Sequence, residues 1–466
     1  MRRVLVVSNG VIGDEMAGPG IRYFNLAREL ARSFHVTLAA PNETSVEIPG
    51  LTVVHADPRS ADVMTELALA HSAVFAQRLP ISTMLHLART PVRTVYDLYD
   101  PLLLESLASS SQAGGRKGLQ PVGGSGSLLV RHEHLVQEVV LATGDSFVCA
   151  SERQRDLWIG WLASVGRLDA EEHARDPTLR SLVDVVPFGI DPTPPRASAQ
   201  PVLRGVLPGV TEESRVLLWG GGIWNWFDPL TVIRAVASLA GRRPDIRLVF
   251  MGGGRPGSAA GETEMPMAAR ARELASDLGV RDGAVIFNDR WVPYDARGSW
   301  LAEADLGLSA HFADIETRFA FRTRLLDYLW AGLPIVSTRG DVLGDLVESH
   351  RLGRAVGVED VDGWVSALDD LLGDAGGCLQ ERRNAAAVRE QFTWPRVASR
   401  LVELLAEPGR RVGSARASWV ATARDREIRA RLSLEYRGAH GIVRHAFDKA
   451  VVNAGRATRS RPKWSR

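Results

Sequence analysis

The chain has 466 residues, 45% of them hydrophobic and 24% charged, with a formal net charge of +1. This length and composition point to a soluble globular protein of two or three domains. Only Cys149 and Cys378 are present, which excludes a disulfide framework and is typical of a reducing compartment. No apolar run approaches the about 18 residues of a spanning helix, and the run at 4–7 is too short for a signal peptide, so we expect a cytoplasmic protein.

Apolar β-branched runs alternate with helical periods along the first part of the chain. This alternation predicts a parallel sheet covered on both faces. Strands are expected at 4–8, 35–40, 51–54, 73–76, 93–99, 146–150 and 183–189, with helices at 21–33, 129–143 and 151–168. The Gly- and Ser-rich stretch 109–127 has no period and predicts a mobile surface loop or lid. Residues 1–191 are thus predicted to form one doubly wound domain.

The same rhythm restarts after the Pro-rich stretch 192–208, which is typical of an interdomain hinge. Strands are expected at 215–222, 246–254, 284–289, 305–310 and 334–338, with helices between them. A second doubly wound domain is therefore predicted over 209–406. Because ligands bind beyond the carboxyl ends of the strands in such sheets, we expect the site in the cleft between the two domains.

Glycines cluster after several predicted strands. The stretch "SNGVIGDEMAGPGIRYF" leads through Gly18 and Gly20 into a helix N-terminus, which favours an anion. It does not have the spacing of the dinucleotide fingerprint. Gly221 and Gly222, after a strand of the second domain, would let a ligand approach the backbone. A tight turn is the alternative interpretation at both places.

Charged residues crowd the front of an otherwise apolar helix in "ETRFAFRTRLLDYLWAGLPIV", residues 316–336. Cations at a helix N-terminus oppose the helix dipole, so Arg322 and Arg324 need an anion to explain them. The alternative is that they form surface ion pairs with acidic neighbours, which contribute little.

Three motifs, taken in their order along the chain, carry a family resemblance. They are "VVPFGID" (185–191), "ADLGLSA" (304–310) and "LLDYLWAGLPIVST" (325–338). Residues 1–405 resemble the retaining nucleotide-sugar glycosyltransferases of the GT-B fold, family 4, also called glycosyl transferases group 1. The resemblance implies an α/β protein of two Rossmann-like domains facing across a cleft. It also implies transfer of a hexosyl or related sugar, with retention, from a nucleoside diphosphate donor to an acceptor hydroxyl, without a metal or a further cofactor.

The resemblance also assigns roles in the second domain, with departures. Members of the family carry two Glu residues separated by seven positions. Asp327 stands at the second position, which binds the ribose, whereas Phe319 stands at the first, so Glu316 is the candidate for the sugar. Family members also carry an Arg and a Lys that neutralise the diphosphate, and Gly222 and Phe227 stand at those places in this chain. Arg322 and Arg324 are the predicted substitutes.

In the first domain, Tyr99 and Asp100 stand where the family often has a His-Asp pair. Asp100 is the candidate for orienting the sugar or the acceptor hydroxyl, and the chemistry of a turn before Pro101 is the alternative. Gly18 to Gly20 would contact the sugar-phosphate region. The predicted catalytic residues are thus Glu316 and Asp100, and the spacing of the carboxylates predicts no metal site.

Residues 407–466 form a basic C-terminal tail. From Arg410 onwards, fifteen Lys or Arg oppose four Asp or Glu, so the rest of the chain is net acidic. Cationic and apolar positions interleave, which favours a helix lying on an anionic membrane at its inner face. The alternatives are a solvated end and a helix packed on the first domain; no nucleic-acid motif accompanies the charge.

The acceptor is left open as a glycan, a glycolipid or a small molecule, in polysaccharide or glycolipid biosynthesis. Two other functions are compatible with the same donor site. One is a GT-B sugar-nucleotide epimerase or hydrolase, and the other is a non-catalytic sugar-nucleotide binding protein.

Overall fold

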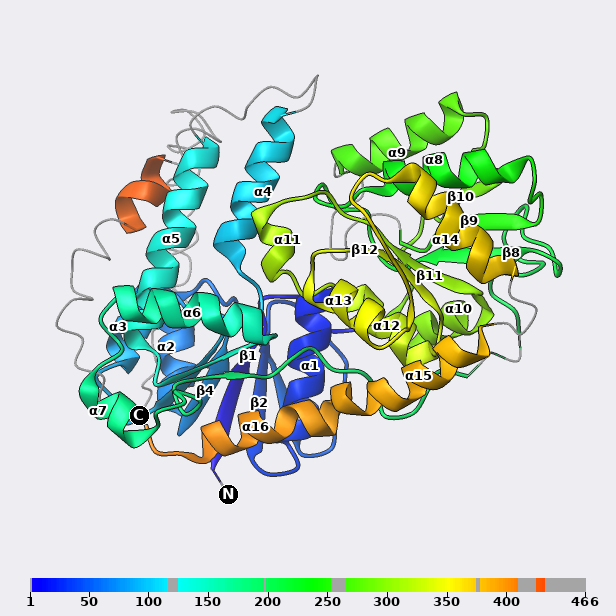
Figure 1. Ribbon diagram of the computed structural model, residues 1–466. Helices are drawn as coiled ribbons and strands as arrows, with labels where there is room; N and C mark the ends of the chain where they lie inside the picture. The colour runs from blue at the N-terminus through cyan, green and yellow to red at the C-terminus, as the bar shows by residue number, and fades with distance from the viewer. Residues whose placement is uncertain are drawn as a thin grey trace, which may run out of the picture.

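The fold is described from a computed structural model, which covers residues 2–115, 125–196, 198, 200–252, 265–373, 378–409 and 425–431. It has two α/β halves side by side, each built on one parallel sheet (Figure 1). Within these residues, no helix is long and apolar enough to cross a membrane.

The first sheet has seven parallel strands in the order β3-β2-β1-β4-β5-β6-β7. The strands are β1 (Arg3–Val7), β2 (His35–Ala40), β3 (Leu51–His55), β4 (Ala73–Ala76), β5 (Arg93–Asp97), β6 (Ser146–Cys149) and β7 (Val183–Val185). In β1, Val4 and Val6 pack on the side of helix α1 (Gly18–Leu30), whereas Leu5 and Val7 pack on the other face. The two buried faces explain why the central strands are continuously apolar. On that other face lie α2 (Ala61–Leu69), α3 (Ile81–Leu87), α5 (Ser125–Thr143) and α6 (Glu152–Ser164), with α7 (Ala170–Arg175) beyond.

The second sheet has six parallel strands in the order β10-β9-β8-β11-β12-β13. The strands are β8 (Arg215–Trp219), β9 (Ile246–Phe250), β10 (Val285–Phe287), β11 (Leu306–Ser309), β12 (Ile335–Thr338) and β13 (Gly353–Val356). The helices are α8 (Pro229–Ala240), α9 (Pro266–Asp277), α10 (Arg297–Glu303), α11 (Ile315–Phe319), α12 (Thr323–Ala331), α13 (Val342–Ser349), α14 (Val361–Gly373) and α15 (Leu379–Arg389), with the short turns η1 (Tyr294–Ala296) and η2 (Glu390–Phe392). The predicted pair of doubly wound sheets is confirmed.

The predicted loop over 109–127 is wrong at both of its ends. Helix α4 (Leu102–Gly115) continues through the serines, and α5 begins at Ser125. Ser and Ala are acceptable in a helix, and α4 packs along α5, so tertiary packing overrides the weak local pattern. The remainder of that loop, 116–124, lies outside the described residues.

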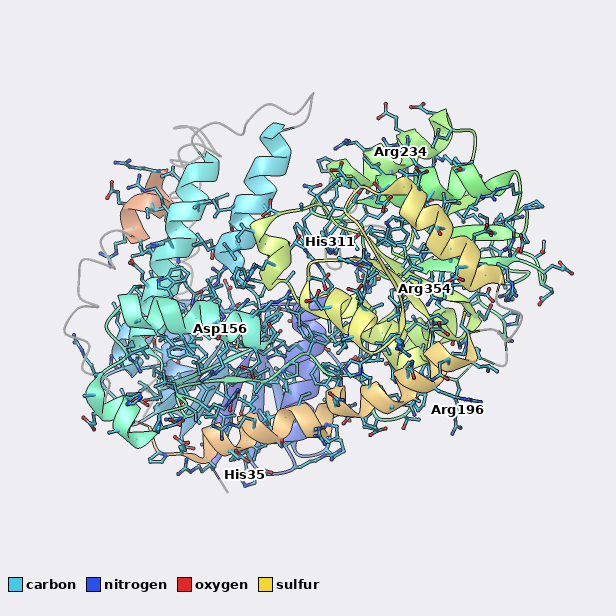
Figure 2. All side chains as sticks on the ribbon, in the orientation of Figure 1. His35, Asp156, Arg196, Arg234, His311 and Arg354 are labelled. Atoms are coloured by element: carbon cyan, nitrogen blue, oxygen red, sulfur yellow. The ribbon has the colours of Figure 1, made fainter. Side chains whose placement is uncertain are left out.

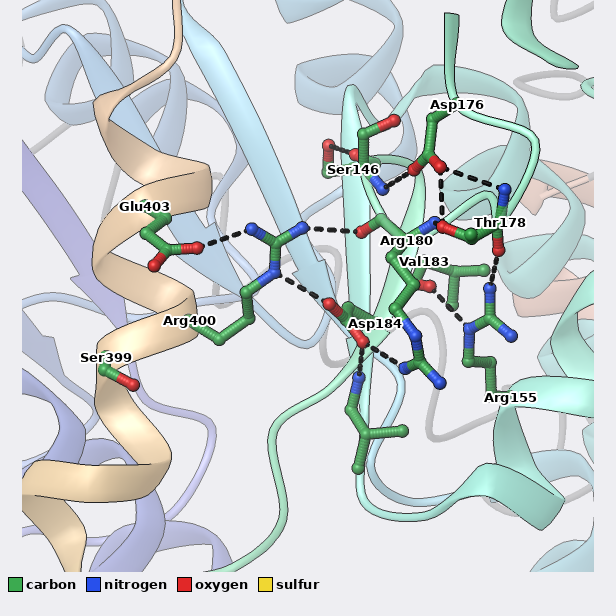
Figure 3. A network of polar contacts seen from close by, with 12 residues as sticks. Ser146, Arg155, Asp176, Thr178, Arg180, Val183, Asp184, Ser399, Arg400 and Glu403 are labelled. Carbon is green, nitrogen blue, oxygen red and sulfur yellow. Dashed lines mark hydrogen bonds and ion pairs between the residues drawn. The ribbon is translucent and has the colours of Figure 1, made fainter.

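The last helix of the second half returns to the first half. Helix α16 (Trp394–Ala406) packs against α1 and the first sheet, and Arg400 anchors it there (Figure 3). Its Nε donates to Asp184 at 2.7 Å, its Nη2 donates to the carbonyl of Arg180 at 2.9 Å, and its Nη1 lies 2.6 Å from Glu403. The two halves are therefore joined by α16 as well as by the connecting segment.

Part of the basic tail packs on the first half. Residues 425–431 form a helical segment beside α5 (Figure 1). The carboxylate of Asp425 lies 2.9 Å from the ring of His132. Ile428 is buried among the apolar residues on the face of the first sheet that lies opposite α1. For this segment, the alternative of a helix packed on the first domain is the one observed. The rest of the tail's helical pattern, 410–424 and 432–466, lies outside the described residues.

Candidate active site in the cleft

Two consecutive helices at the carboxyl ends of β11 and β12 carry the predicted charged residues. The side chain of Asp314 caps α11 by accepting from the N–H of Glu316 at 3.0 Å. Tyr328 ties α12 to the sheet, since its hydroxyl lies 3.0 Å from the carbonyl of Leu218 and 2.8 Å from that of Leu308. A Cβ at Gly307 would lie 2.3 Å from the Tyr328 ring, so this glycine of the "ADLGLSA" motif is required for the close packing.

Arg324 is buried without a carboxylate partner among the residues that the structure describes. Its Nη2 donates to the carbonyl of Gly222 at 2.9 Å, and its Nη1 has no hydrogen-bond partner. The guanidinium lies 3.9 Å from the ring centroid of Phe227 and 4.7 Å from that of Trp219. Burial lowers the pKa of Arg324 to about 10. A cation from α12 thus lies beside Gly222 and Phe227, the two places where the resembling family carries its own cations.

Arg322 is buried beside it but has a partner. Its Nη2 lies 2.5 Å from Oε2 of Glu316, and its guanidinium lies 5.2 Å from the ring centroid of Phe227. Its Nε has no hydrogen-bond partner. Glu316 is itself buried, and its negative charge offsets the positive charge of Arg322. The predicted sugar-binding and diphosphate-binding residues therefore neutralise each other.

Two carboxylates of the first half approach this pair. Asp100 and Glu105, at the start of α4, share a hydrogen bond, and both interact electrostatically with Glu316 and Arg322. Burial, opposed by the Glu105 hydrogen bond, raises the pKa of Asp100 to about 6. Burial and the charge of Asp100 raise the pKa of Glu105 well above its usual value. Glu105 was not among the residues predicted from the sequence.

The predicted ribose ligand, Asp327, is partly exposed, and Arg297 and Arg324 are cations that act on its carboxylate. Arg297 of α10 lies 3.4 Å from its carboxylate, and the Arg297 guanidinium lies 3.8 Å from the ring centroid of Tyr294. Burial is the main cause of the raised pKa of Asp327. With 37% of its side chain exposed, the carboxylate remains open to hydroxyl groups.

The predicted glycines are explained by close backbone contacts or by an unusual backbone conformation. A Cβ at Gly20 would lie 2.2 Å from the carbonyl of Val11, and one at Gly10 would lie 2.7 Å from the N–H of Gly20. The loop after β1 therefore packs tightly on the start of α1, where Gly18 has open space. Gly221 has a positive φ of 83°, and its carbonyl carbon would lie 2.9 Å from a Cβ at Gly252. Both clusters make the turns that the alternative interpretation describes.

Contacts between the two halves border the cleft. Gln154, at the start of α6, donates at 2.8 Å to the carbonyl of Tyr99 and at 2.8 Å to the carbonyl of Phe319. Arg153 pairs with Asp345 across the same border. On the opposite side of the cleft, the N–H of Tyr294 donates to the carbonyl of Asp14 at 2.8 Å. The strand-end Asp97 is fully buried and receives Arg22 through two hydrogen bonds of 2.6 and 2.9 Å, so it is a structural partner.

His311 follows β11 and was not singled out from the sequence (Figure 2). It is completely buried, and its Nε2 lies 3.2 Å from Oδ2 of Asp341, at an angle that makes no hydrogen bond. Across the described ranges, no group of three or more His, Cys, Asp or Glu side chains is arranged to hold a metal ion.

Comparisons with known proteins show which proteins the chain is similar to. Residues 214–374 match the family described as "Glycosyl transferases group 1". The chain is 28% identical over 224 residues to a D-inositol 3-phosphate glycosyltransferase of Paenarthrobacter aurescens, covering 47% of this chain and 50% of that protein. A protein of the same name from Thermobispora bispora is 26% identical over 207 residues, 44% and 46% of the two chains. The matched region thus spans about half the length of these curated relatives.

Solved structures match over a longer part of the chain. Sucrose-phosphate synthase from Thermosynechococcus elongatus is 15% identical and superposes with a TM-score of 0.62, covering 87% of this chain and 98% of its own. Anabaena HepE in complex with UDP-glucose is 14% identical, with a TM-score of 0.62 and coverage of 87% and 100%. The chain has the GT-B fold, and its residues 214–374 are similar to the group 1 glycosyltransferases.

Within this GT-B chain, the site departs from the resembling family at matched positions. Phe319 contributes only its carbonyl, to Gln154, in place of an acidic side chain. Phe227 contributes a ring face to Arg324 in place of a cation. The charge thus comes from α12 instead of the loop after β8.

Proposed function

We propose that this protein is a retaining glycosyltransferase that moves a sugar from a nucleoside diphosphate donor to an acceptor hydroxyl. The similarity to group 1 glycosyltransferases and the GT-B fold support a nucleotide-sugar donor. The observation that carries the proposal is Arg324, a buried cation with no carboxylate partner in the described part of the chain and one guanidinium nitrogen free of hydrogen bonds. A buried charge without a partner is costly, and an anionic ligand would compensate it.

The donor diphosphate is assigned to this position. Arg324 would bind the diphosphate beside the backbone of Gly221 and Gly222. Arg322 would contribute through its Nε, which has no hydrogen-bond partner among the described residues. The N-terminus of α1 at Gly18 and Gly20, which has no side-chain cap and no acidic residue in its first turn, would face the sugar-phosphate from the other half. Asp327 would accept from the ribose hydroxyls, and Glu316 would position the sugar.

In the proposed reaction, the bond between the anomeric carbon and the β-phosphate oxygen breaks while the acceptor oxygen bonds to that carbon on the same face. The acceptor proton passes to the departing phosphate oxygen, so the nucleoside diphosphate leaves protonated. Arg324 and Arg322 would stabilise the charge that develops on the leaving group. Asp100 would orient the acceptor hydroxyl or the sugar, and the proposal assigns no step to a metal.

A donor panel tests the proposal. Thermal unfolding of the full chain is measured with nucleoside diphosphate sugars that differ in sugar and base, since a ligand of the folded state raises the melting temperature. The best donor is then incubated with and without a mixture of glycans, glycolipids and polyols. We expect the release of nucleoside diphosphate to accelerate with acceptor and the product to retain its anomeric configuration. Equal release without any acceptor would indicate a hydrolase, and binding without turnover would indicate a binding protein.

The tail adds a second element to the proposal, namely that the protein works at the cytoplasmic face of a membrane. The excess of Lys and Arg after Arg410 supports attraction to anionic lipid. The packing of 425–431 on α5 leaves Arg429 and Arg431 more than half exposed, at 52% and 58%. Basic groups next to the first half would bring the cleft near a lipid-linked acceptor.

A further inference from the structure

A small polar pocket opens in the first half, at the carboxyl ends of β4 and β5 and against α5. Its polar lining consists of Gln77, Arg78, Asp97, Asp100, Glu133 and Gln137. Asp100 belongs both to this pocket and to the carboxylate cluster that faces Glu316 and Arg322. The pocket therefore adjoins the proposed donor site, on the side from which an acceptor would approach.

The cationic groups at this pocket are already neutralised. Arg78 pairs with Glu133 at 2.5 Å, and Asp97 receives two hydrogen bonds from Arg22. Asp100 has no such cation of its own and interacts only at longer range with Arg322. The lining is thus net negative whenever Asp100 is ionised, so a phosphate group entering the pocket would meet repulsion.

The pocket also has an unused donor. The Nε2 of Gln137 is buried and has no hydrogen-bond partner, although a buried amide N–H is costly to leave unpaired. A hydroxyl or ether oxygen would satisfy it, and neighbouring carboxylate oxygens of Asp100 and Glu133 would accept from hydroxyl hydrogens. The volume of the pocket is about 10 Å³, which is room for one water-sized group, so this set of donors and acceptors matches a single uncharged hydroxyl group of an acceptor.

We propose that this pocket binds one uncharged hydroxyl group of the acceptor and excludes acceptors that carry a phosphate at that position. The inference rests on the proposed transferase function and narrows its substrate class. It separates this chain from relatives whose names specify an inositol phosphate. Gln137 and Glu133 are the residues that determine the specificity, Gln137 by donating to the acceptor and Glu133 by neutralising Arg78.

The test uses the full chain, the donor found in the panel, and matched acceptor pairs that differ only by a phosphate, such as inositol and inositol phosphate or a methyl hexoside and its 6-phosphate. We expect the neutral member of each pair to have a kcat/KM at least 10-fold higher. Binding of the same pairs in the presence of nucleoside diphosphate is measured by ligand-observed NMR. A preference for the phosphorylated member, in turnover or in binding, would overturn the proposal.

Two variants test the named residues. Glu133→Gln should free Arg78 and raise the ratio of phosphorylated to neutral kcat/KM at least 10-fold, whereas Glu171→Gln on the exposed face of α7 should not. Gln137→Leu should raise the acceptor KM 3- to 10-fold and leave the donor KM unchanged. Gln380→Leu is its control, because the side chain of Gln380 is exposed on α15. An unchanged ratio in a folded Glu133→Gln protein contradicts the proposal. If neither acceptor binds while the donor does, the acceptor inference fails and the donor assignment stands; if no donor binds, the proposed function fails first.

Discussion

At the scale of single residues, Arg324 differs from the other buried arginines of the site in having no carboxylate partner in the described chain. Arg22 has Asp97 and Arg322 has Glu316. Arg324 instead has aromatic rings and one carbonyl, and its pKa is lowered by burial. A guanidinium remains charged at neutral pH even with such a shift, so the site keeps a positive charge available for a ligand.

Replacing Arg324 should therefore weaken donor binding more than replacing an exposed neighbour. We expect Arg324→Ala to reduce affinity for the nucleoside diphosphate by about 1.5–3 kcal/mol, the range for a hydrogen bond to a charged group. Arg322→Ala should have a smaller effect, because the charge of Arg322 is already paired with Glu316. Arg318→Ala is the control, because the side chain of Arg318 is exposed on α11. Calorimetry on the three variants measures the effect, and undiminished affinity in the Arg322/Arg324 double variant would rule out the assignment.

A second prediction at this scale concerns Asp327. Because its carboxylate is 37% exposed and lies 3.4 Å from Arg297, Asp327→Asn should keep the fold and lose nucleotide affinity about 10-fold. Titration with the nucleoside diphosphate, alongside a circular dichroism melt, separates the two effects. A large drop in melting temperature with unchanged affinity would make Asp327 a structural residue.

The pair Asp100 and Glu105 predicts a pH dependence. Both pKa values are raised in the folded chain, that of Asp100 from 3.8 to about 6. The folded state therefore binds more protons than the unfolded state between about pH 4 and 6, and the free energy of unfolding falls as the pH rises through that window. Urea unfolding at pH 4.5 and 7.5 should show a smaller fall in Asp100→Asn/Glu105→Gln than in the wild type. Glu171→Gln is the exposed control, and equal falls in all three proteins would disprove the coupling.

Several site residues could be predicted from the sequence because their neighbours in the chain define them. The cations before an apolar helix mark the start of α12. Gln154 and Arg297 were missed because their partners lie far along the chain, as Phe319 does from Gln154. Glu105 was missed because its approach to Glu316 and Arg322, which are also far along the chain, is not visible in a local pattern. The pairing of Arg322 with Glu316 was one of the alternatives, but its burial was not visible in a local pattern, since burial depends on the packing of α4 against α11.

At the scale of elements, α16 is an anchor for the first sheet. Arg400→Ala would remove the contacts with Asp184 and the carbonyl of Arg180, and Asp184 would keep only Arg180 as a cationic partner. We expect a loss of about 1–2 kcal/mol in the free energy of unfolding, since the contacts are partly exposed. Arg396→Ala, exposed on the same helix, should change it by less than about 0.5 kcal/mol. Equal stability of the two variants in urea would show that the network contributes nothing.

Element boundaries followed the local pattern where that pattern was strong. The apolar runs of β1 and β4 read directly as buried strands, because both faces of the sheet are covered, whereas β9 ends at Phe250, before the end predicted for it at 254. Helix α4 was not predicted, because its serines and glycines resemble a loop and only its packing along α5 favours a helix. Tertiary contacts thus decide the weakly patterned segments.

At the scale of the whole molecule, the basic tail predicts a salt-dependent attraction. The intact chain should sediment with vesicles containing anionic lipid at low salt and be released as salt screens the charges. A chain ending at Glu407 keeps α16 and should remain in the supernatant. Neutral vesicles are the control for lipid packing. Equal sedimentation of the two chains, or of neither, would remove the membrane from the proposal and favour an acceptor that is free in solution.

The return of α16 to the first half has a consequence for fragments of the chain. Trp394 is buried against Gly189, where a Cβ would lie 2.4 Å from its ring, and Arg93 of β5 donates to the carbonyl of Leu404. An excised fragment 1–191 would expose this apolar surface and leave it open to aggregation. A single proteolytic cut in 200–208, by contrast, should yield two pieces that stay together through gel filtration. The two halves of the fold therefore do not coincide with two separable pieces of polypeptide.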